Sequence, residues 1–533
     1  MKKQLIALGL AAGITAGTFS GISAADEENI AVHLTAEIST MDTNLIATAE
    51  NMMIAYQTNE GLYTYDENGT ATLGMADSVD ISEDGLTYTF IIRDAQWSDG
   101  TPVTANDFEY SWKRLADPDT GATYAFMVGT AGIKNAAAVT SGEAEVDTLG
   151  VEAVDDKTLV VELDKPVPYL PSLLIGPYFM PINQEFCEAQ GDQYGLTKDN
   201  ILSNGPFQLT DWEPGSLEVT VSKNPNYYGA DNVLINSITY KTITDSQQAI
   251  MAWETGDLDE INITGDNVLL YKDNEAFSAR ETPMLWYIAA NTAVEGLENA
   301  NLRLALALAY DKDAIVNNIL QNDSVPANFA VPTKFAKNAD GVTFRETADA
   351  TYLASDKEAA KEYFAKAVEE LGKSEFTFEL LYDDADDTKN IAQFIQSEIQ
   401  TTLPGVTINL QVQPKKQRTE LMNNKEFELG LTRWGADYQD ATTFLNLWTS
   451  DSAYNYGSWS NADYDALMAQ VNGEFAADNE ARVNAMVEAE SIVMSEAGIL
   501  PVYQTTTTYL TNPKYVVPVN EKGQNIWKHA KLA

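Results

Sequence analysis

The sequence predicts an α/β protein made of several lobes, and three observations lead to this prediction. The chain has 533 residues, which is too long for one hydrophobic core and suggests about three domains at roughly 150 residues each. Residues 376–413 read as a βαβ unit: a strand, a helix at 388–403 and a second strand. β-rich runs occur at 86–93 and 158–164. Because βαβ and β-rich segments occur in one chain, we expect an α/β protein with separate lobes.

Segments of helical period predict helices at several places along the chain. Thr104 can cap a helix with one buried face. The residues of that face are Phe108, Trp112 and Leu115. A longer apolar pattern of helical period covers residues 301–320, and two amphipathic helices are expected at 358–371 and at about 479–496.

The composition excludes some classes of partner. Apolar residues make up 44% of the chain and aromatic residues 10%, which is typical of an ordered protein. The 33 basic and 79 acidic residues give a net charge of -46. Such a charge repels the phosphate backbone of nucleic acid, and no basic cluster could hold an anionic membrane surface. We therefore expect neither nucleic acid nor a membrane surface as a partner.

The first residues indicate export. Lys2 and Lys3 precede an apolar run, and small residues precede Ala25, a pattern that predicts a signal peptide over residues 1–24. No later stretch approaches the roughly 18 apolar residues of a membrane span. The single cysteine, Cys187, cannot form an internal disulfide and lies too far along the chain to carry an amino-terminal lipid. An extracytoplasmic protein held together by packing alone is expected.

The sequence lacks the common catalytic patterns. Its two histidines, His33 and His529, lie at opposite ends of the chain and belong to no motif. No zinc-protease, serine-hydrolase or nucleotide-binding motif occurs, and the acidic run at 383–387 lacks the glycine and glutamate of a calcium loop. We expect binding without catalysis, cofactor or metal. An extracellular carboxylate-dependent hydrolase stays an alternative, because 79 acidic residues supply many carboxylates without marking one pair.

Six blocks of the sequence carry a family resemblance. They are NEGLYTYD (59–66), LTYTFIIRDAQWSDGTPVTANDFEYSWKRLADP (86–118), SNGPFQLTDWEPG (203–215), NPNYYG (224–229), NANLRLALALAYDKDAIV (299–316) and LTRWGADYQDATTFLNLW (431–448). In this order they resemble blocks of the extracytoplasmic solute-binding proteins of family 5, the OppA-like oligopeptide-binding proteins of ABC transporters. The resemblance covers essentially the whole mature chain.

The resemblance implies a two-lobed periplasmic-binding-protein fold of type II (cluster C), with three domains and a hinge. Domain I would comprise residues 25–72, 204–280 and 506–533, domain II residues 73–203, and domain III residues 281–505. The two crossings, near 280 and 505, would act as hinges, and the lobes would close around a ligand.

The resemblance also implies where a peptide binds. The ligand would lie extended between domains I and III and pair through its main chain with two strands of the protein, so that affinity does not depend on its sequence. By position these strands would be Glu60, Gly61 and Leu62 in domain I, and Arg433, Trp434 and Gly435 in domain III. Glycine suits a place where another backbone approaches closely.

Asp437 matches the family aspartate that pairs with the peptide's α-amino group. An ammonium entering a poorly hydrated cleft needs an opposite charge, because a buried unpaired ion costs several kcal/mol. Without the resemblance, a turn or helix-cap role would be favoured for Asp437, although Asp440 suits that role better. An arginine that helps to hold peptide carboxylates in enteric relatives is replaced here by Leu431, and Arg433 could take a carboxylate instead.

These observations predict an exported receptor that captures oligopeptides and delivers them to the permease and ATPase subunits of an ABC importer. A monomer is expected. Lipid-anchored relatives carry a cysteine where this chain has Ile22, so no lipid anchor is predicted. Alternatives with the same fold are receptors for a dipeptide, a metal chelate, haem, a sugar or a signalling peptide pheromone, and Asp437 disfavours metal and sugar.

Overall fold

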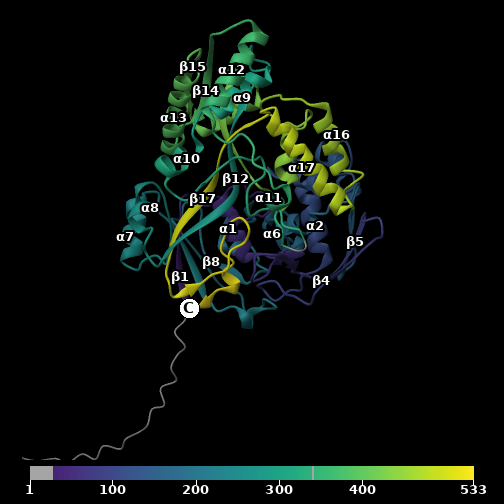
Figure 1. Ribbon diagram of the computed structural model, residues 1–533. Helices are drawn as coiled ribbons and strands as arrows, with labels where there is room; N and C mark the ends of the chain where they lie inside the picture. Colours follow the sequence, from purple (N-terminus) through teal and green to yellow (C-terminus); the bar gives the residue numbers. More distant parts are fainter. Residues whose placement is uncertain (1–27, 339–340) are drawn as a thin grey trace, which may run out of the picture.

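A computed structural model describes residues 28–338 and 341–533 of the chain, so the predicted signal peptide lies outside the described residues. The fold is mixed α/β and is organised by one long sheet (Figure 1). In spatial order its strands are β15 (Val406–Gln413), β14 (Phe376–Asp383), β16 (Leu429–Gly435), β12 (Phe277–Ala290), β17 (Leu500–Thr511), β11 (Glu260–Ile263), β1 (Asn29–Leu34), β10 (Ser237–Thr242), β9 (Glu218–Lys223) and β8 (Phe207–Asp211). The short β13 (Val325–Pro326) pairs with β17.

Strands β12 and β17 run antiparallel through the middle of the molecule (Figure 1). We call residues 28–280 and 506–533 lobe 1, and residues 281–505 lobe 2. The pairing of β12 with β17 shifts register at the border between them, from Glu281 opposite Thr506 to Leu285 opposite Gln504. The extra residues on β12 form a bulge, which bends a strand locally.

Each lobe has its own apolar core. Two clusters of buried side chains draw almost entirely on lobe 1, and two others draw on lobe 2 alone. The exception is Tyr438, a lobe 2 residue that joins the core of lobe 1. Tyr438 therefore marks a place where the lobes touch.

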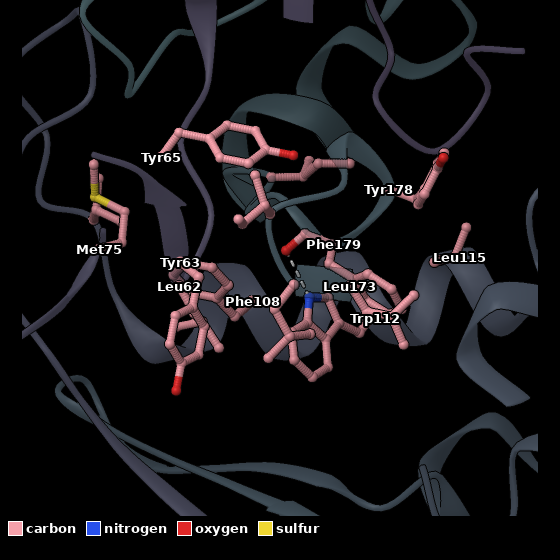
Figure 2. Packing of buried hydrophobic residues seen from close by; sticks show 14 of the residues in the cluster. Leu62, Tyr63, Tyr65, Met75, Phe108, Trp112, Leu115, Leu173, Tyr178 and Phe179 are labelled. Carbon is pink, nitrogen blue, oxygen red and sulfur yellow. Dashed lines mark hydrogen bonds between the residues drawn. The ribbon is translucent and has the colours of Figure 1, made fainter. Parts of the chain in front are cut away.

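Lobe 1 also holds a smaller antiparallel sheet of β4 (Ala76–Ile81), β5 (Thr87–Ile92), β7 (Thr158–Glu162) and β6 (Val151–Asp155). Helix α2 (Ala105–Ala116) packs against it with the predicted face buried (Figure 2). Thr104 and Asp107 form a capping box at the start of the helix, and the Trp112 indole donates to the Phe179 carbonyl at 2.9 Å. The prediction of this helix is confirmed.

Lobe 2 contains the predicted βαβ unit, in which α13 (Asp386–Thr402) joins the parallel strands β14 and β15. The expected helices near 358 and 479 are present as α12 (Lys357–Leu371) and α17 (Asn479–Ser495). The pattern at 301–320 is not one helix. Helix α9 (Ala300–Leu308) ends, and Asp311 caps a new start by accepting the N–H of Ala314. The ammonium of Lys312, directly after this cap, is buried and donates to the carbonyl oxygens of Ala327 and Leu353. One continuous helix would not bring the Lys312 side chain to these two carbonyls.

The remaining elements that bear on the site are short. They are α1 (Ala49–Thr58), β2 (Tyr63–Tyr65), β3 (Ala71–Leu73), α14 (Lys415–Asn423), α15 (Thr442–Leu445) and α16 (Ala462–Val471). No helix in residues 28–338 or 341–533 combines the length and the apolar character that crossing a membrane requires.

Candidate functional site

Strand β16 has an edge that no other strand covers along most of its length. On one side β12 pairs with it from Ala290 opposite Leu429 to Met284 opposite Gly435. On the other side β14 pairs only with Leu429 and Gly430. Within the described residues, positions 431–435 therefore keep one row of backbone groups without a strand neighbour. Such an edge is a template for the addition of another strand.

The segment at 60–62 in lobe 1 is far more occupied. Both backbone groups of Glu60 pair with the side chain of Asn204, at 3.0 and 2.8 Å. The carbonyl groups of Gly61 and Leu62 accept N–H bonds from residues 74–76, and the Leu62 side chain lies in the core. Of the backbone groups of residues 60–62, the N–H groups of Gly61 and Leu62 alone have no acceptor among the described residues, so a ligand could pair with these two groups.

The Glu60 carboxylate belongs to the framework of lobe 1. It accepts hydrogen bonds from the Tyr227 and Tyr228 hydroxyls and lies 2.8 Å from the Lys528 ammonium. Burial alone would raise the pKa of Glu60, but Lys528 and the two hydroxyls outweigh it and lower the pKa. The carboxylate is therefore charged and has its acceptors filled.

The two glycines of the predicted binding strands differ in their surroundings. A Cβ atom on Gly61 would lie 2.6 Å from the Leu174 carbonyl oxygen, which is rigid backbone of lobe 1. A Cβ atom on Gly435 would meet only the end of the Met284 side chain, at 3.5 Å, an ordinary contact. Packing within lobe 1 thus requires the first glycine, whereas the second leaves space open beside the free edge of β16.

Asp437 follows directly on that edge. Its N–H donates to the Thr443 hydroxyl at 3.1 Å, and its carbonyl accepts from the Lys522 ammonium at 3.0 Å. Its carboxylate accepts no hydrogen bond from residues 28–338 or 341–533. Burial raises the pKa of Asp437, and the charge of Lys522 opposes this only in part. Asp437 thus presents a half-buried carboxylate that no donor of the described residues satisfies.

Aromatic side chains surround this carboxylate. Burial raises the pKa values of Tyr124 and Tyr178 in lobe 1 and of Tyr454 in lobe 2, and the charge of Asp437 raises them further. Tyr124 and Tyr178 stack with their ring centroids 4.5 Å apart, and Tyr178 lies above the α2 core in Figure 2. Tyr454 packs edge-on against Trp434 at 4.8 Å. A carboxylate among aromatic rings is an environment that suits an ammonium group.

Asp440, three residues further on, is fully engaged within the protein. Its two oxygens pair with Arg482 at 2.7 Å each, and it accepts the N–H of Thr442 at 3.0 Å. The expectation that Asp440, rather than Asp437, serves the local turn is confirmed.

Cations gather at the other end of the free edge. The Arg433 guanidinium lies over the Trp286 ring at 4.7 Å, and 3.7 Å from the Asp383 carboxylate. Arg418 shares the same carboxylate at 3.4 Å. The pKa of Lys415 is lowered by burial and by the charges of Arg433 and Arg418. Three cations thus lie near Asp383 at this end of the edge, opposite in sign to Asp437.

Residues 436–440 connect the lobes directly. The Gln439 N–H donates to the Ser172 hydroxyl at 3.2 Å, and Tyr438 stacks on Tyr169 with centroids 4.3 Å apart. Together with the bond from Lys522 to Asp437, these contacts hold the end of β16 against lobe 1. The structure therefore brings residues 437–439 against lobe 1, whereas the Glu60 side chain is turned to internal contacts of lobe 1.

The sequence did not single out Lys415, Lys522 or the tyrosines around Asp437. These residues come from distant parts of the chain, and none belongs to the blocks that mark the binding strands. Outside residues 1–27 and 339–340, no group of three or more His, Cys, Asp or Glu side chains could hold a metal ion.

Comparison with known proteins identifies the family. A sequence model of bacterial extracellular solute-binding proteins, family 5, matches residues 70–456. A dipeptide-binding protein of Lactococcus lactis subsp. cremoris is 31% identical over 93% of this chain and 92% of its own length. The periplasmic oligopeptide-binding protein OppA of Salmonella typhimurium is 30% identical over 96% of this chain and 95% of its own.

A solved structure confirms the predicted fold class. Listeria monocytogenes OppA, bound to peptide, superposes with a TM-score of 0.78 at 33% identity, covering 95% of this chain and 99% of that protein. The α/β fold is that of the OppA-type periplasmic binding proteins. On the matched residues and the fold together, the chain belongs to family 5 of the bacterial extracellular solute-binding proteins.

Proposed function

We propose that the protein is an extracytoplasmic receptor that captures peptides between its lobes and delivers them to an ABC-type import permease. The observation that carries this proposal is the free edge of β16, which ends at the unsatisfied carboxylate of Asp437. A strand edge binds any extended main chain, whereas the carboxylate decides its direction. The names of the Lactococcus and Salmonella relatives support peptides as the ligand class.

The bound peptide runs antiparallel to β16, with its amino end at Asp437. A hydrogen bond to a charged group contributes roughly 1.5–3 kcal/mol, which is enough to fix the direction of the peptide. Gly61 and Leu62 add N–H donors from lobe 1, Gly435 gives the peptide room, and Trp434 forms part of the wall. Arg433 and Lys415 attract the carboxylate end. Because a strand rises about 3.3 Å per residue, the distance from Asp437 to Arg433 suits peptides of about three to five residues.

The proposed domain division follows the boundaries given above, with hinges near residues 280 and 505. The register shift between β12 and β17 lies at this border and supports bending there. Export by the signal peptide, a monomeric receptor, and partnership with permease and ATPase subunits complete the proposal. The protein performs no chemistry on the peptide.

Native mass spectrometry of the protein purified from its host tests this function. A series of bound masses that correspond to short peptides is expected. A single non-peptide mass would overturn the proposal, as would the release of shortened peptides when the protein is incubated with a peptide mixture.

A further inference from the structure

Lys522 of lobe 1 lies beside the residue that receives the amino end of the peptide. Its ammonium donates to the Asp437 carbonyl at 3.0 Å. The carbonyl oxygen and the carboxylate of one aspartate are separated by only a few bonds, so the ammonium lies within roughly 9 Å of that carboxylate. Screening in 0.1 M salt acts over about 10 Å and is weaker where groups are partly buried. The two charges therefore interact.

The loop that carries Lys522 is held by its own hydrogen bonds. Val519 and Asn525 form a β-bridge across its base. Inside the loop, the side-chain oxygen of the buried Asn520 accepts the N–H groups of Lys522 and Gln524, at 3.0 and 2.9 Å. The main chain of Lys522 is thus fixed in the folded protein, and the Lys522 side chain takes no part in fixing it.

The positive charge of Lys522 is not cancelled within lobe 1. Among the described residues, its ammonium forms no ion pair, and its one hydrogen bond goes to the Asp437 carbonyl. The neighbouring Glu521 carboxylate is turned away to accept the Tyr65 hydroxyl at 2.9 Å. Burial raises the pKa of Glu521, and the charge of Lys522 opposes this only in part. Lys522 therefore remains a cation that can act on groups at Asp437.

A peptide ammonium bound at Asp437 would share this space with Lys522. The carboxylate attracts both cations, whereas the two cations repel each other. An ammonium then gains less from Asp437 than it would gain from a carboxylate without a cation nearby. A peptide with an acylated amino end carries no charge there and avoids the repulsion, while Lys522 partly compensates the carboxylate that such a peptide leaves unpaired.

We infer that Lys522 limits how strongly the receptor discriminates free from blocked amino ends, and that peptides with an acylated amino end are among its ligands. The inference rests on the proposed function and adds a ligand class to it. Asp437 binds the ammonium, and Lys522 sets how much that ammonium is worth.

The test is calorimetric titration of the full protein with one tetrapeptide, prepared with a free and with an acetylated amino end. The original protein should bind the acetylated form at most about thirtyfold more weakly than the free form. Lys522→Gln removes the charge and keeps a polar side chain, so it should increase this ratio of dissociation constants at least threefold. Loss of the bond to the Asp437 carbonyl affects both peptides and cancels in the ratio.

Two further variants separate the charge at residue 522 from other effects. Lys522→Arg keeps the charge and should give the original ratio within about twofold. Lys361→Gln removes an exposed cation on α12, where Lys361 pairs with Glu358, and should leave the ratio unchanged. Thermal unfolding curves check that each variant folds, as expected from the hydrogen bonds that Asn520 supplies to the loop.

The outcomes are distinguishable. A ratio that stays the same or falls in Lys522→Gln would overturn the inference and leave peptide binding intact. The same conclusion follows if the original protein binds the free peptide but not the acetylated one, or if Lys361→Gln increases the ratio as much as Lys522→Gln does. Failure of both forms of the peptide to bind would instead remove the proposed function.

Discussion

The two predicted binding segments, one in each lobe, differ in how many of their polar groups already have a hydrogen-bond partner within the protein. In lobe 1, the segment at 60–62 has most of its polar groups bound within the protein, and the Glu60 carboxylate is filled by Lys528 and two tyrosines. In lobe 2, residues 431–437 keep a free edge and an unsatisfied carboxylate. Lobe 1 therefore supplies a rigid surface, whereas lobe 2 holds most of the polar groups that are free to bind and orient a ligand. Changes in lobe 1 should therefore cost stability, and changes in lobe 2 should cost affinity.

The largest effect is expected on the framework side. Glu60→Ala leaves the buried Lys528 ammonium without its partner, and removing one member of a buried ion pair costs about 3–5 kcal/mol. Urea denaturation measures this loss. Glu67→Ala is the matched control, because Glu67 pairs with Lys531 at the surface, with both side chains more than half exposed, and should cost less than about 1 kcal/mol. Similar losses in the two variants would contradict the framework role.

The two glycines give a direct contrast. Gly61→Ala would bring Cβ to 2.6 Å from the Leu174 carbonyl, and overpacking of this kind costs about 1–3 kcal/mol. Gly435→Ala should change the free energy of unfolding by less than about 0.5 kcal/mol, yet weaken peptide binding severalfold. Denaturation and calorimetry on both variants check this, and the contrast fails if Gly435→Ala is the less stable of the two.

Asp437→Asn is expected to weaken binding of free-amine peptides at least tenfold, or about 1.4 kcal/mol. Peptides acetylated at the amino end should lose much less, because they carry no ammonium. Calorimetry with both forms of one peptide measures the difference. Equal losses would mean that Asp437 has a structural role.

Arg433 should act at the opposite end of the peptide. Converting the peptide's carboxylate to an amide is expected to weaken binding about threefold to tenfold, or about 0.7–1.4 kcal/mol. Arg433→Gln should remove most of this difference. If the variant discriminates acid from amide as strongly as the original protein, Arg433 does not contact the carboxylate.

The smallest effect concerns pH. Because the folded pKa of Asp437 is raised above its usual value of 3.8, the folded state keeps this proton to higher pH than the unfolded chain does. The stabilisation is fully present below pH 3.8 and is lost as the pH rises through the raised pKa. Relative to Asp437→Asn, the original protein should lose stability across this window, while its affinity for free-amine peptides rises. Denaturation curves of both proteins at several pH values test the sign.

Local features of the fold were predictable from the sequence, and contacts between distant segments were not. Thr104 and the apolar spacing after it define α2 without tertiary information. The break near Lys312 was missed because its cause is a set of partners in another segment. The role of Asp440 in the turn before α15 followed from its place two residues before Thr442, whose N–H it accepts.

The candidate site divides in the same way. The resemblance to a family placed Arg433, Trp434 and Gly435 on one strand and Asp437 just beyond it, because these residues follow one another closely in the sequence. It could not show that the Asn204 side chain forms hydrogen bonds with both backbone groups of Glu60, since the two residues lie far apart in the chain. Lys522 and Lys415 are ordinary surface residues by local pattern, and only the folded chain brings them to opposite ends of the free edge.

The pairing of Glu281 with Thr506 has a topological consequence. Lobe 2 begins and ends at neighbouring positions of one strand pair, so in genetic terms it is an insertion carried by a single hairpin. Replacing residues 282–505 by a tight turn would keep the pairing of β12 with β17 from Phe277 opposite Leu510 to Glu281 opposite Thr506. It would also preserve the apolar clusters of lobe 1, except for Tyr438. The binding groups could thus be exchanged as one cassette on a constant platform.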